Sequence, residues 1–292
     1  MATKQAGKNA QPKKAAIPER LVTSTPVVSV AAYLAELAKL KFSEKKLWFR
    51  GVGNSSYTLS PSLFRHQTHT TKASLSMLEG DLNETFRMRS FPYTDASRWQ
   101  DDIWDQLFFM QHYRVPTRLL DWSASPLVAL HFAITSVQED EDGEPESDIA
   151  IWVLDPEVWN KAVYEGTQFA GGVLSPRDSW INRYQPDEIY KLPTNIPPVA
   201  MRGSHNSPRI VAQQGFFTIF GSERRPLEDF YCKHLNEGGG LAFPAPCLSK
   251  ISIPKAKISA VKKEMFALGV AESTIYPDIE GLASELKRSF DF

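Results

Sequence analysis

A run of six apolar residues, Ile149-Ala-Ile-Trp-Val-Leu154, is the feature that most constrains how this chain can fold. A strand with one face in water alternates polar and apolar residues, whereas an uninterrupted apolar run is typical of a strand covered on both faces. The run therefore predicts a central strand in a sheet that helices flank. The chain has 292 residues, which is enough for one large domain or two small ones.

Further strands and helices are predicted around this central strand. Strands are expected at residues 47–51 and 250–254, and on both sides of a turn at Gly215 within residues 209–220. Helices are expected where apolar residues recur every three or four positions, namely at residues 34–40, 75–86, 101–108, 125–137, 258–268 and 279–286. Strands and helices do not alternate regularly. The predicted fold class is therefore α+β, with a small central mixed or antiparallel sheet flanked by helices.

Two segments depart from this pattern. Residues 1–20 are polar and rich in lysine, so we expect a disordered basic tail that extends to residue 26. A single domain is expected from residue 27 to residue 292. Residues 156–205 carry scattered glycines and prolines, which predicts long ordered loops or a lid.

Composition indicates the cellular compartment in which the protein is expected. Cys232 and Cys247 are the only cysteines, so no disulfide framework is expected and the cytosol is favoured. The N-terminal residues contain no apolar leader, and no apolar run approaches the roughly 18 residues that span a bilayer. A net charge of −1 gives no overall attraction to nucleic acid or to a membrane. We expect a soluble cytoplasmic protein.

Three segments form a specific combination when they occur in this order. The first is Phe49-Arg50-Gly51, and the second joins Gln111-His112 to residues 116–122 and 129–133. The third is 209–217, and residues 275–282 follow it. Together they resemble the FRG domain family, which takes its name from a Phe/Tyr-Arg-Gly motif. The resemblance runs from about residue 44 to residue 288. Arg114 departs from it, because the family usually has a small residue there, often Gly.

The same order of segments is similar, more distantly, to ADP-ribosyltransferases. Those enzymes carry an Arg or His at the end of the first core strand, and a helix ending Ala-x-x-Phe-Ala follows. A catalytic Glu then precedes a glycine turn. This resemblance implies an ADP-ribosyltransferase-like fold and NAD+ as a ligand or substrate. No carboxylate lies between Arg209 and Gly215 here, so the family's catalytic Glu has no counterpart at that position.

Arg50 is the first candidate site residue. It ends an apolar strand, where an unpaired guanidinium would be very costly. It could pair with Asp121 or Glu84 inside the fold, or it could bind a phosphate or ribose, for which its forked geometry is suited. Gly51 would allow a ligand to approach the backbone closely.

Asp121 and its neighbours offer the chemistry of a catalytic or binding cleft. Asp121 could accept from an arginine, orient His112 or bind a ribose hydroxyl, and His112 could act as an acid or base near neutral pH. The candidates for catalysis are Asp121, His112 and Glu84. The candidates for ligand binding are Arg50, Gly51, Arg118, Trp122, Gln213, Gln214 and Arg209. Structural roles compete with several of these, namely a core position for Trp122 and a surface position for Glu84.

Two functions remain open at this point. In the first, a nucleotide-type small molecule, with NAD+ as the possible substrate, binds these residues and is cleaved or gives its ADP-ribose to an unknown acceptor. In the second, the same cleft of a non-catalytic module recognises a protein or nucleic-acid partner. We expect no metal, since His66-x-x-His69 and Cys232-Lys-His234 do not complete a four-ligand set. We also expect no membrane partner. Either way, we predict that Arg50, His112, Asp121 and one of Gln213 and Gln214 converge on one concave site.

Overall fold

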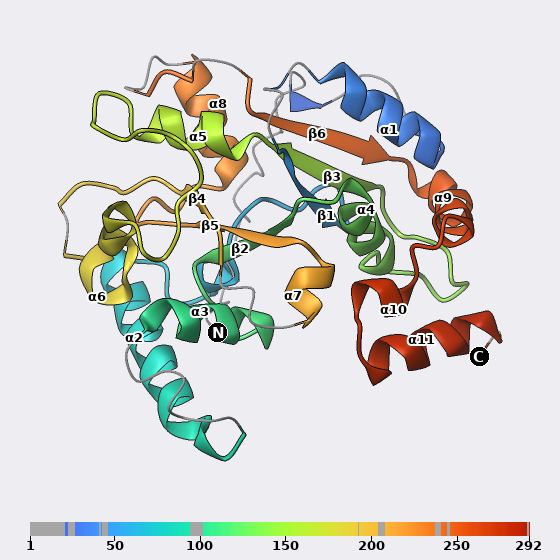
Figure 1. Cartoon of the computed structure of the whole chain (residues 1–292), viewed down its shortest axis with the longest axis horizontal. Coiled ribbons are helices and arrows are strands. Elements are labelled where there is room, and N and C mark those ends of the chain that lie inside the picture. Colours follow the sequence, from blue (N-terminus) through green and yellow to red (C-terminus); the bar gives the residue numbers. More distant parts are fainter. Residues whose placement is uncertain are drawn as a thin grey trace, which may run out of the picture.

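The computed structural model describes residues 21–22, 27–40, 42, 46–93, 102–191, 193–203, 208–236, 241–243, 246–290 and 292. Within these residues six strands form one open sheet in the order β4-β5-β2-β1-β3-β6, and every neighbouring pair is antiparallel (Figure 1). The strands are β1 Trp48–Val52, β2 Leu119–Ser123, β3 Ile149–Leu154, β4 Val199–Met201, β5 Gly215–Ile219 and β6 Leu248–Ile253. The predicted α+β class is confirmed, and the sheet is antiparallel.

The apolar run that constrained the fold is the buried strand β3, between β1 and β6. Its side chains alternate between the two faces of the sheet. Ala150, Trp152 and Leu154 join one apolar cluster, whereas Ile149, Ile151 and Val153 join another. A strand with an apolar cluster on each face has no position that favours a polar side chain, which explains the uninterrupted run.

Helices cover both faces of the sheet. The cluster around Ile151 includes residues of α1 Val30–Lys39, α4 Pro126–Thr135 and α9 Lys255–Ala267. The cluster around Trp152 includes residues of α5 Pro156–Val163 and α8 Leu227–Asn236. A third cluster lies where β4 and β5 meet α3 Ile103–His112. The remaining elements are η2 Ser62–Arg65, α2 Lys72–Arg89, η3 Phe91–Tyr93, η5 Ser179–Tyr184, α6 Pro186–Ile189, α7 Pro208–Ala212, α10 Glu272–Ile275 and α11 Ile279–Ser289.

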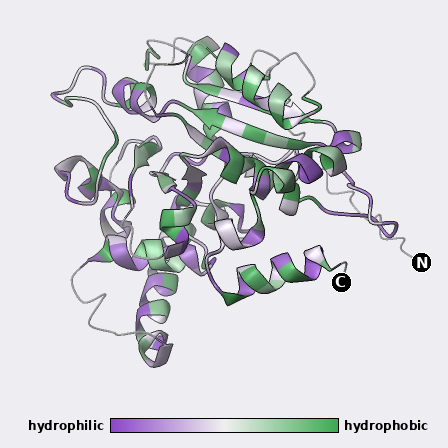
Figure 2. Ribbon diagram, turned by 45° about the vertical axis from the view of Figure 1, so that its right-hand side comes forward, coloured by the Kyte–Doolittle hydropathy of each residue, from purple (hydrophilic) through white to green (hydrophobic). Residues whose placement is uncertain are grey.

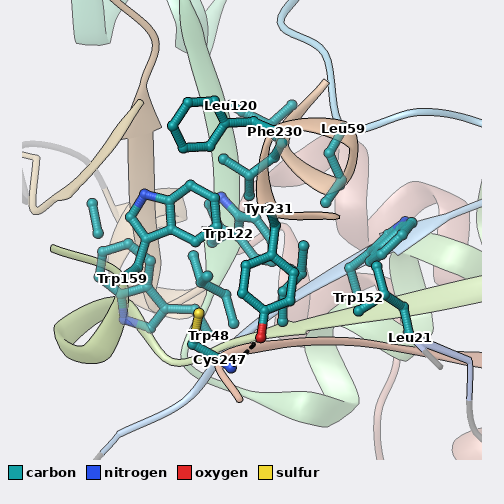
Figure 3. Close-up of a cluster of buried hydrophobic side chains, with 14 of the residues drawn as sticks. Leu21, Trp48, Leu59, Leu120, Trp122, Trp152, Trp159, Phe230, Tyr231 and Cys247 are labelled. Carbon is teal, nitrogen blue, oxygen red and sulfur yellow. Dashed lines mark hydrogen bonds between the residues drawn. The ribbon is translucent and has the colours of Figure 1, made fainter. Parts of the chain in front are cut away.

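The aromatic core on the Trp152 face is shown in Figure 3. Trp48, Trp122 and Trp159 are buried there with Tyr231, whose hydroxyl accepts a hydrogen bond of 3.2 Å from the backbone N–H of Cys247. The indole N–H of Trp122 donates to Thr218 Oγ1 at 3.1 Å. Trp122 therefore belongs to the core through its ring, and it also lines the cleft, so its role as a ligand contact stays a prediction.

Local signals at helix starts are confirmed. Ser125 accepts from the backbone N–H of Val128, and Pro126 is the first residue of α4. Asp102 caps α3 in the same way through Trp104 N–H. Asp101, where we expected this helix to begin, lies outside the described residues. Side-chain oxygens before a helix satisfy N–H groups that have no partner within it, so these residues fix where each helix begins.

Three predictions need correction. Residues 208–212 form the helix α7 rather than a strand, because Pro208 stands at the first position of the helix and favours its dihedral angles. The segment 156–205 contains α5, η5, α6 and β4, joined by shorter loops than expected. Two residues assigned to the tail pack against the sheet: Leu21 is buried, and Val22 forms a parallel bridge with Lys250. Residues 1–20 and 23–26 lie outside the described residues.

None of the helices in the described part of the chain is both long enough and apolar enough to cross a bilayer.

Candidate functional site

A cleft of about 580 Å³ opens beside the end of β1 and β2. Its volume lies in the range of small-molecule sites. Its walls come from α3, α4 and α7, which lie around β2 and β5 in Figure 1. Its polar lining residues are Arg50, Gln111, His112, Arg114, Asp121, Ser123, Thr135, Ser136, Arg209 and Gln213, and its aromatic ones include Phe108, Phe132, Phe217 and Tyr276. The predicted convergence of Arg50, His112, Asp121 and Gln213 is therefore found, although their roles as ligand contacts stay predictions.

Arg50 lies where β1 and β2 diverge. These two strands share one register pair, Phe49 with Ser123, whereas β1 and β3 share five. Beyond that pair, Arg50 Nη1 donates to the main-chain oxygen of Asp121 at 2.7 Å. The guanidinium thus supplies a hydrogen bond that the sheet does not, while about a quarter of its side chain (24%) stays exposed. Burial lowers the pKa of Arg50 and the Asp121 carboxylate opposes that effect, so the group remains a cation.

Asp121 presents its carboxylate to the cleft. Its Oδ2 lies 3.6 Å from Arg50 Nη1 and accepts from Gln111 Nε2 at 2.7 Å. The Thr117 hydroxyl donates to Gln111 Oε1 at 2.6 Å, which fixes the amide with its NH₂ group toward Asp121. No described residue donates a hydrogen bond to Oδ1, and the side chain is 55% exposed. A carboxylate held by one oxygen and open at the other is oriented and still accessible.

His112 and Arg209 both line the cleft, and the charge of Arg209 acts on the titration of His112. Burial lowers the pKa of His112, and Arg209 lowers it further, whereas Asp121 raises it. The imidazole is therefore neutral at physiological pH and able to accept a proton. The Arg209 guanidinium lies 4.5 Å from the centre of the Tyr276 ring, within cation–π range. Phe132 contacts the same ring edge-on at 6.1 Å.

Gln213 ties α7 to the C-terminal part of the chain. Its Nε2 donates to the main-chain oxygen of Ile275 at 3.3 Å, and its own main-chain oxygen accepts from the Ser123 hydroxyl at 2.7 Å. Gln214 is exposed, has φ of 47°, and does not line the cleft. The ligand-binding assignment of Gln214 is corrected on that ground. The left-handed turn at Gln214 directs consecutive side chains apart, and only Gln213 points into the cleft.

Gly51 has a packing role that its motif position did not reveal. A Cβ at Gly51 would lie 1.8 Å from the main-chain oxygen of Ala129, and one at Gly53 would lie 2.1 Å from that of Ser136. The backbone of α4 therefore occupies the space that we assigned to a ligand. Gly51 lines the cleft, but it is glycine because α4 crosses β1 so closely.

Arg118 does not reach the cleft. Its side chain is fully buried, and Nε donates to both oxygens of Glu79 at 2.8 and 2.9 Å. Nη2 donates to the main-chain oxygen of Tyr184 at 2.6 Å, and Nη1 donates to that of Phe220. Every nitrogen of the guanidinium serves the fold, so its ligand-binding assignment is wrong. On α2, Glu79 is buried, and the candidate Glu84 is exposed outside the cleft, so its catalytic assignment is corrected.

Several cleft residues were missed as site candidates, among them Gln111, Phe132 and Tyr276. Gln111 and Phe132 lie within the quoted motif segments, and Tyr276 lies in the segment 275–282 that resembles the family's ending. Their presence in motif segments was the available signal. Within the described residues, no cluster of three His, Cys, Asp or Glu side chains is arranged as a metal site.

Arg114 adopts φ of 61°, the left-handed region, directly after α3. Glycine adopts this conformation without strain, which accounts for the small residue usual at this position of the resemblance. The departure at Arg114 therefore leaves the turn intact and adds a cation to the rim of the cleft.

The chain thus has a mixed α+β fold whose cleft is built at a splayed pair of strands. Residues 45–142, about a third of the chain, match the model of the FRG domain. The chain therefore contains an FRG domain, and that segment supplies β1, α3, β2 and α4 to the cleft. The remaining wall, formed by α7, β5 and Tyr276, lies outside the matched segment. No curated protein and no solved structure matches the chain.

Proposed function

We propose that the cleft binds a nucleotide-type ligand, with NAD+ foremost, and that the chain cleaves its nicotinamide–ribose bond or transfers its ADP-ribose to an acceptor. One observation carries this proposal. Three arginines, a partly open carboxylate, a histidine and two glutamine amides, which lie between residues 50 and 213, share one cleft with the aromatic ring of Tyr276. Cations, a carboxylate and flat apolar surface are the groups that phosphate, ribose and base require.

The cations and the aromatic rings would recognise different parts of the nucleotide. Arg50 and Arg209 carry the forked donors that suit phosphate oxygens. Tyr276 and Phe132 offer ring surface against which a base can stack. Gln213 offers an amide for a base or nicotinamide edge. The nucleotide would thus extend from Arg50, where β1 and β2 diverge, to the side of the cleft that Tyr276 forms.

Cleavage requires a group that stabilises positive charge on the ribose. As the bond between C1′ and the nicotinamide nitrogen breaks, its electron pair leaves with nicotinamide and the ribose becomes oxocarbenium-like. The Asp121 carboxylate would stabilise that charge, since catalysis depends on charges placed where charge develops. Water, or an acceptor nucleophile, forms the new bond to C1′ and loses a proton, which neutral His112 would take.

A non-catalytic binding module is the second candidate. Asp121 is the one carboxylate among the described lining residues, and Arg50 and Gln111 already engage it. A carboxylate that pairs with Arg50 where β1 and β2 diverge suits a recognition site as well as a catalytic one. This alternative keeps the same cleft and removes the chemical step.

Incubation with NAD+ separates the two candidates. The enzyme hypothesis predicts release of free nicotinamide, followed by chromatography, together with a rise in the melting temperature of the protein when NAD+ is present. A rise without nicotinamide release would identify a binding module for the nucleotide. If neither occurs, the nucleotide proposal is wrong and the cleft serves another partner.

A variant pair localises the binding. Arg209→Ala should weaken the NAD+-dependent rise in melting temperature, because it removes a cation from the cleft wall. Arg202→Ala is the matched control, since Arg202 is exposed and does not line the cleft. Equal responses of the two variants would place the nucleotide outside this cleft.

A further inference from the structure

The C-terminal helix α11 stands apart from the body of the molecule. Figure 1 shows it beneath α9 and α10, and Figure 2 shows from a second direction that this C-terminal helix extends away from the sheet. Isolated helices of this length are marginal in water, so a lone amphipathic helix gains stability from a surface to pack on. One face of α11 packs on other helices of the chain, whereas the opposite face is exposed.

One face of α11 is fixed to α10 and α9. Gly281 is buried against the backbone of Tyr276, and a Cβ there would lie 2.0 Å from the Tyr276 oxygen. Glu285 accepts from the Ser273 hydroxyl. Arg288 donates to Glu272 at 3.1 Å and lies 3.5 Å from the centre of the Phe266 ring. The helix is therefore held in a defined orientation.

The opposite face carries a stripe of exposed large apolar residues. Ile279 is 80% exposed, Leu282 45%, Leu286 48% and Phe290 70%. Their spacing of three, four and four residues places them on one side of a helix. Single exposed apolar residues are ordinary, but a contiguous stripe on a fixed helix marks an interaction surface.

Two charged residues flank this stripe on the same side. Glu280 and Lys287 are both exposed and are seven residues apart, which is close to two helical turns. Glu280 lies near the start of the helix and Lys287 near its end. When two such helices pack face to face in antiparallel directions, the flank of one meets the same flank of the other with its order reversed. Each Glu280 then meets a Lys287, whereas a parallel pair gains no such match.

We propose that the stripe on α11 packs against the same stripe of a second copy of this chain, in an antiparallel pair with its two-fold axis near Ala283 and Ser284. In this register Leu282 of one copy lies beside Leu286 of the other. Ile279 lies between Leu286 and Phe290 of the other copy. The small side chain of Ala283, beside the stripe and near the axis, lets the helices approach. Self-complementary surfaces of this kind form two-fold homodimers.

The charge pattern also argues against a lipid surface. Helices that lie on membranes carry mainly lysine and arginine on their polar face. The exposed flank of α11 has one acid and one base. The pairing helix is joined directly to the cleft, because Tyr276 connects α10 to α11 and lines the cleft wall.

Sedimentation of the full chain, from about 10 µM to about 1 mM, tests the pairing over the range expected for a small interface. Dimer should form with rising concentration, and Leu286→Glu should abolish it. Leu235→Glu is the matched control, because Leu235 is an exposed leucine on α8. Glu280→Lys and Lys287→Glu should each weaken the dimer roughly tenfold, because the two-fold axis applies each change twice. The combined variant should recover it.

Cross-linking tests the direction of the pair. Cys232 and Cys247 are buried, so introduced cysteines report alone. A mixture of Glu280→Cys and Lys287→Cys should cross-link with a short bismaleimide, whereas Glu280→Cys alone should not. Self-linking of Glu280→Cys alone, or a wild-type chain that remains monomeric throughout, would overturn the proposal. Monomeric protein that binds vesicles of neutral and anionic lipid through Leu286 would make the stripe a membrane surface instead. None of these readouts depends on NAD+ turnover.

Discussion

Two arginine–carboxylate pairs in this molecule join the same kinds of charged group in different surroundings. Arg118 and Glu79 meet in the interior, with side-chain exposures of 0% and 4% and two hydrogen bonds below 3 Å. Arg50 and Asp121 meet in the cleft at 3.6 Å, with exposures of 24% and 55%. The first guanidinium uses all of its nitrogens within the fold, whereas the second makes one main-chain bond and keeps part of its surface open.

The difference shows how burial decides whether an ion pair is structural. A buried pair must be complete, because either charge left alone in the interior is very costly. A pair in an open cleft tolerates the loss of a partner, since water can solvate what remains. Arg118 and Glu79 therefore hold α2 against the sheet, whereas Arg50 and Asp121 retain capacity for a ligand.

The buried pair should give the largest effect on stability. Glu79→Gln leaves the Arg118 charge unpaired in the interior, and we expect a loss of roughly 3–5 kcal/mol in the free energy of unfolding. Urea denaturation measures it. Glu84→Gln, on the exposed side of the same helix, is the matched control and should change stability by less than about 0.5 kcal/mol.

Replacing both partners of the buried pair separates charge from packing. Glu79→Leu combined with Arg118→Met should recover much of the loss, because an apolar pair leaves no stranded charge. Equal destabilisation by Glu79→Gln and Glu84→Gln would show that the interior pair has no special role.

A second buried carboxylate, Glu228, sharpens the comparison, because no arginine among the described residues forms an ion pair with it. Glu228 is fully buried and accepts from the backbone N–H of Leu59 through both oxygens. Burial raises its pKa to about 7, although Lys250 opposes the shift. A folded-state pKa above the unfolded value stabilises the protein at low pH, and this stabilisation is lost as the pH rises through about 7. The free energy of unfolding should fall by roughly 2–3 kcal/mol from pH 5 to pH 8 through this group.

Glu228→Gln isolates this contribution. The variant should lose that part of the pH dependence, measured as the difference between urea denaturation at pH 5 and pH 8. If the free energy of unfolding changed with pH in the same way in the wild type and in the variant, the raised pKa of Glu228 would be contradicted.

The sequence predicted the class of fold and about half of its elements, whereas the strands β2 and β4 and the helices α5 and α8 were not expected. The uninterrupted run of β3 and the cap formed by Ser125 and Pro126 are local signals, and both were read correctly. Residues 208–212 misled, because Ile210 and Val211 favour strands while the helical start at Pro208 prevailed. Propensity is a weak guide over five residues, where tertiary packing decides.

The site was predicted only in part, for a reason that the two arginines illustrate. Arg50 and Arg118 each belong to a motif, and both sequence contexts allowed a ligand or an internal partner. The partner of Arg118 is Glu79, 39 residues away on α2, and no spacing rule connects the two. The close crossing of α4 over Gly51 is equally invisible in the sequence, since it depends on where a distant helix packs.

Arg50→Ala should have an intermediate effect. It removes a charged hydrogen bond to the Asp121 main-chain oxygen and a half-exposed ion pair, so we expect a loss of roughly 1–2 kcal/mol in the free energy of unfolding. The variant should remain folded by circular dichroism and should lose the NAD+-dependent rise in melting temperature. A loss as large as that of Glu79→Gln would make Arg50 a structural residue like Arg118.

Asp121→Asn should have the smallest effect on stability and the largest on chemistry. The carboxylate is exposed and an amide keeps its shape, so the free energy of unfolding should change by less than about 1 kcal/mol. Nicotinamide release should fall about a hundredfold or more, because the group that stabilises the oxocarbenium-like charge becomes neutral. NAD+ binding should be weakened less than by Arg50→Ala. A readout independent of turnover is the pKa of His112 by NMR titration: Asp121 raises it, so the variant should lower it, and Arg209→Ala should raise it. An unchanged His112 pKa in both variants would mean that these three groups do not share one cleft in solution.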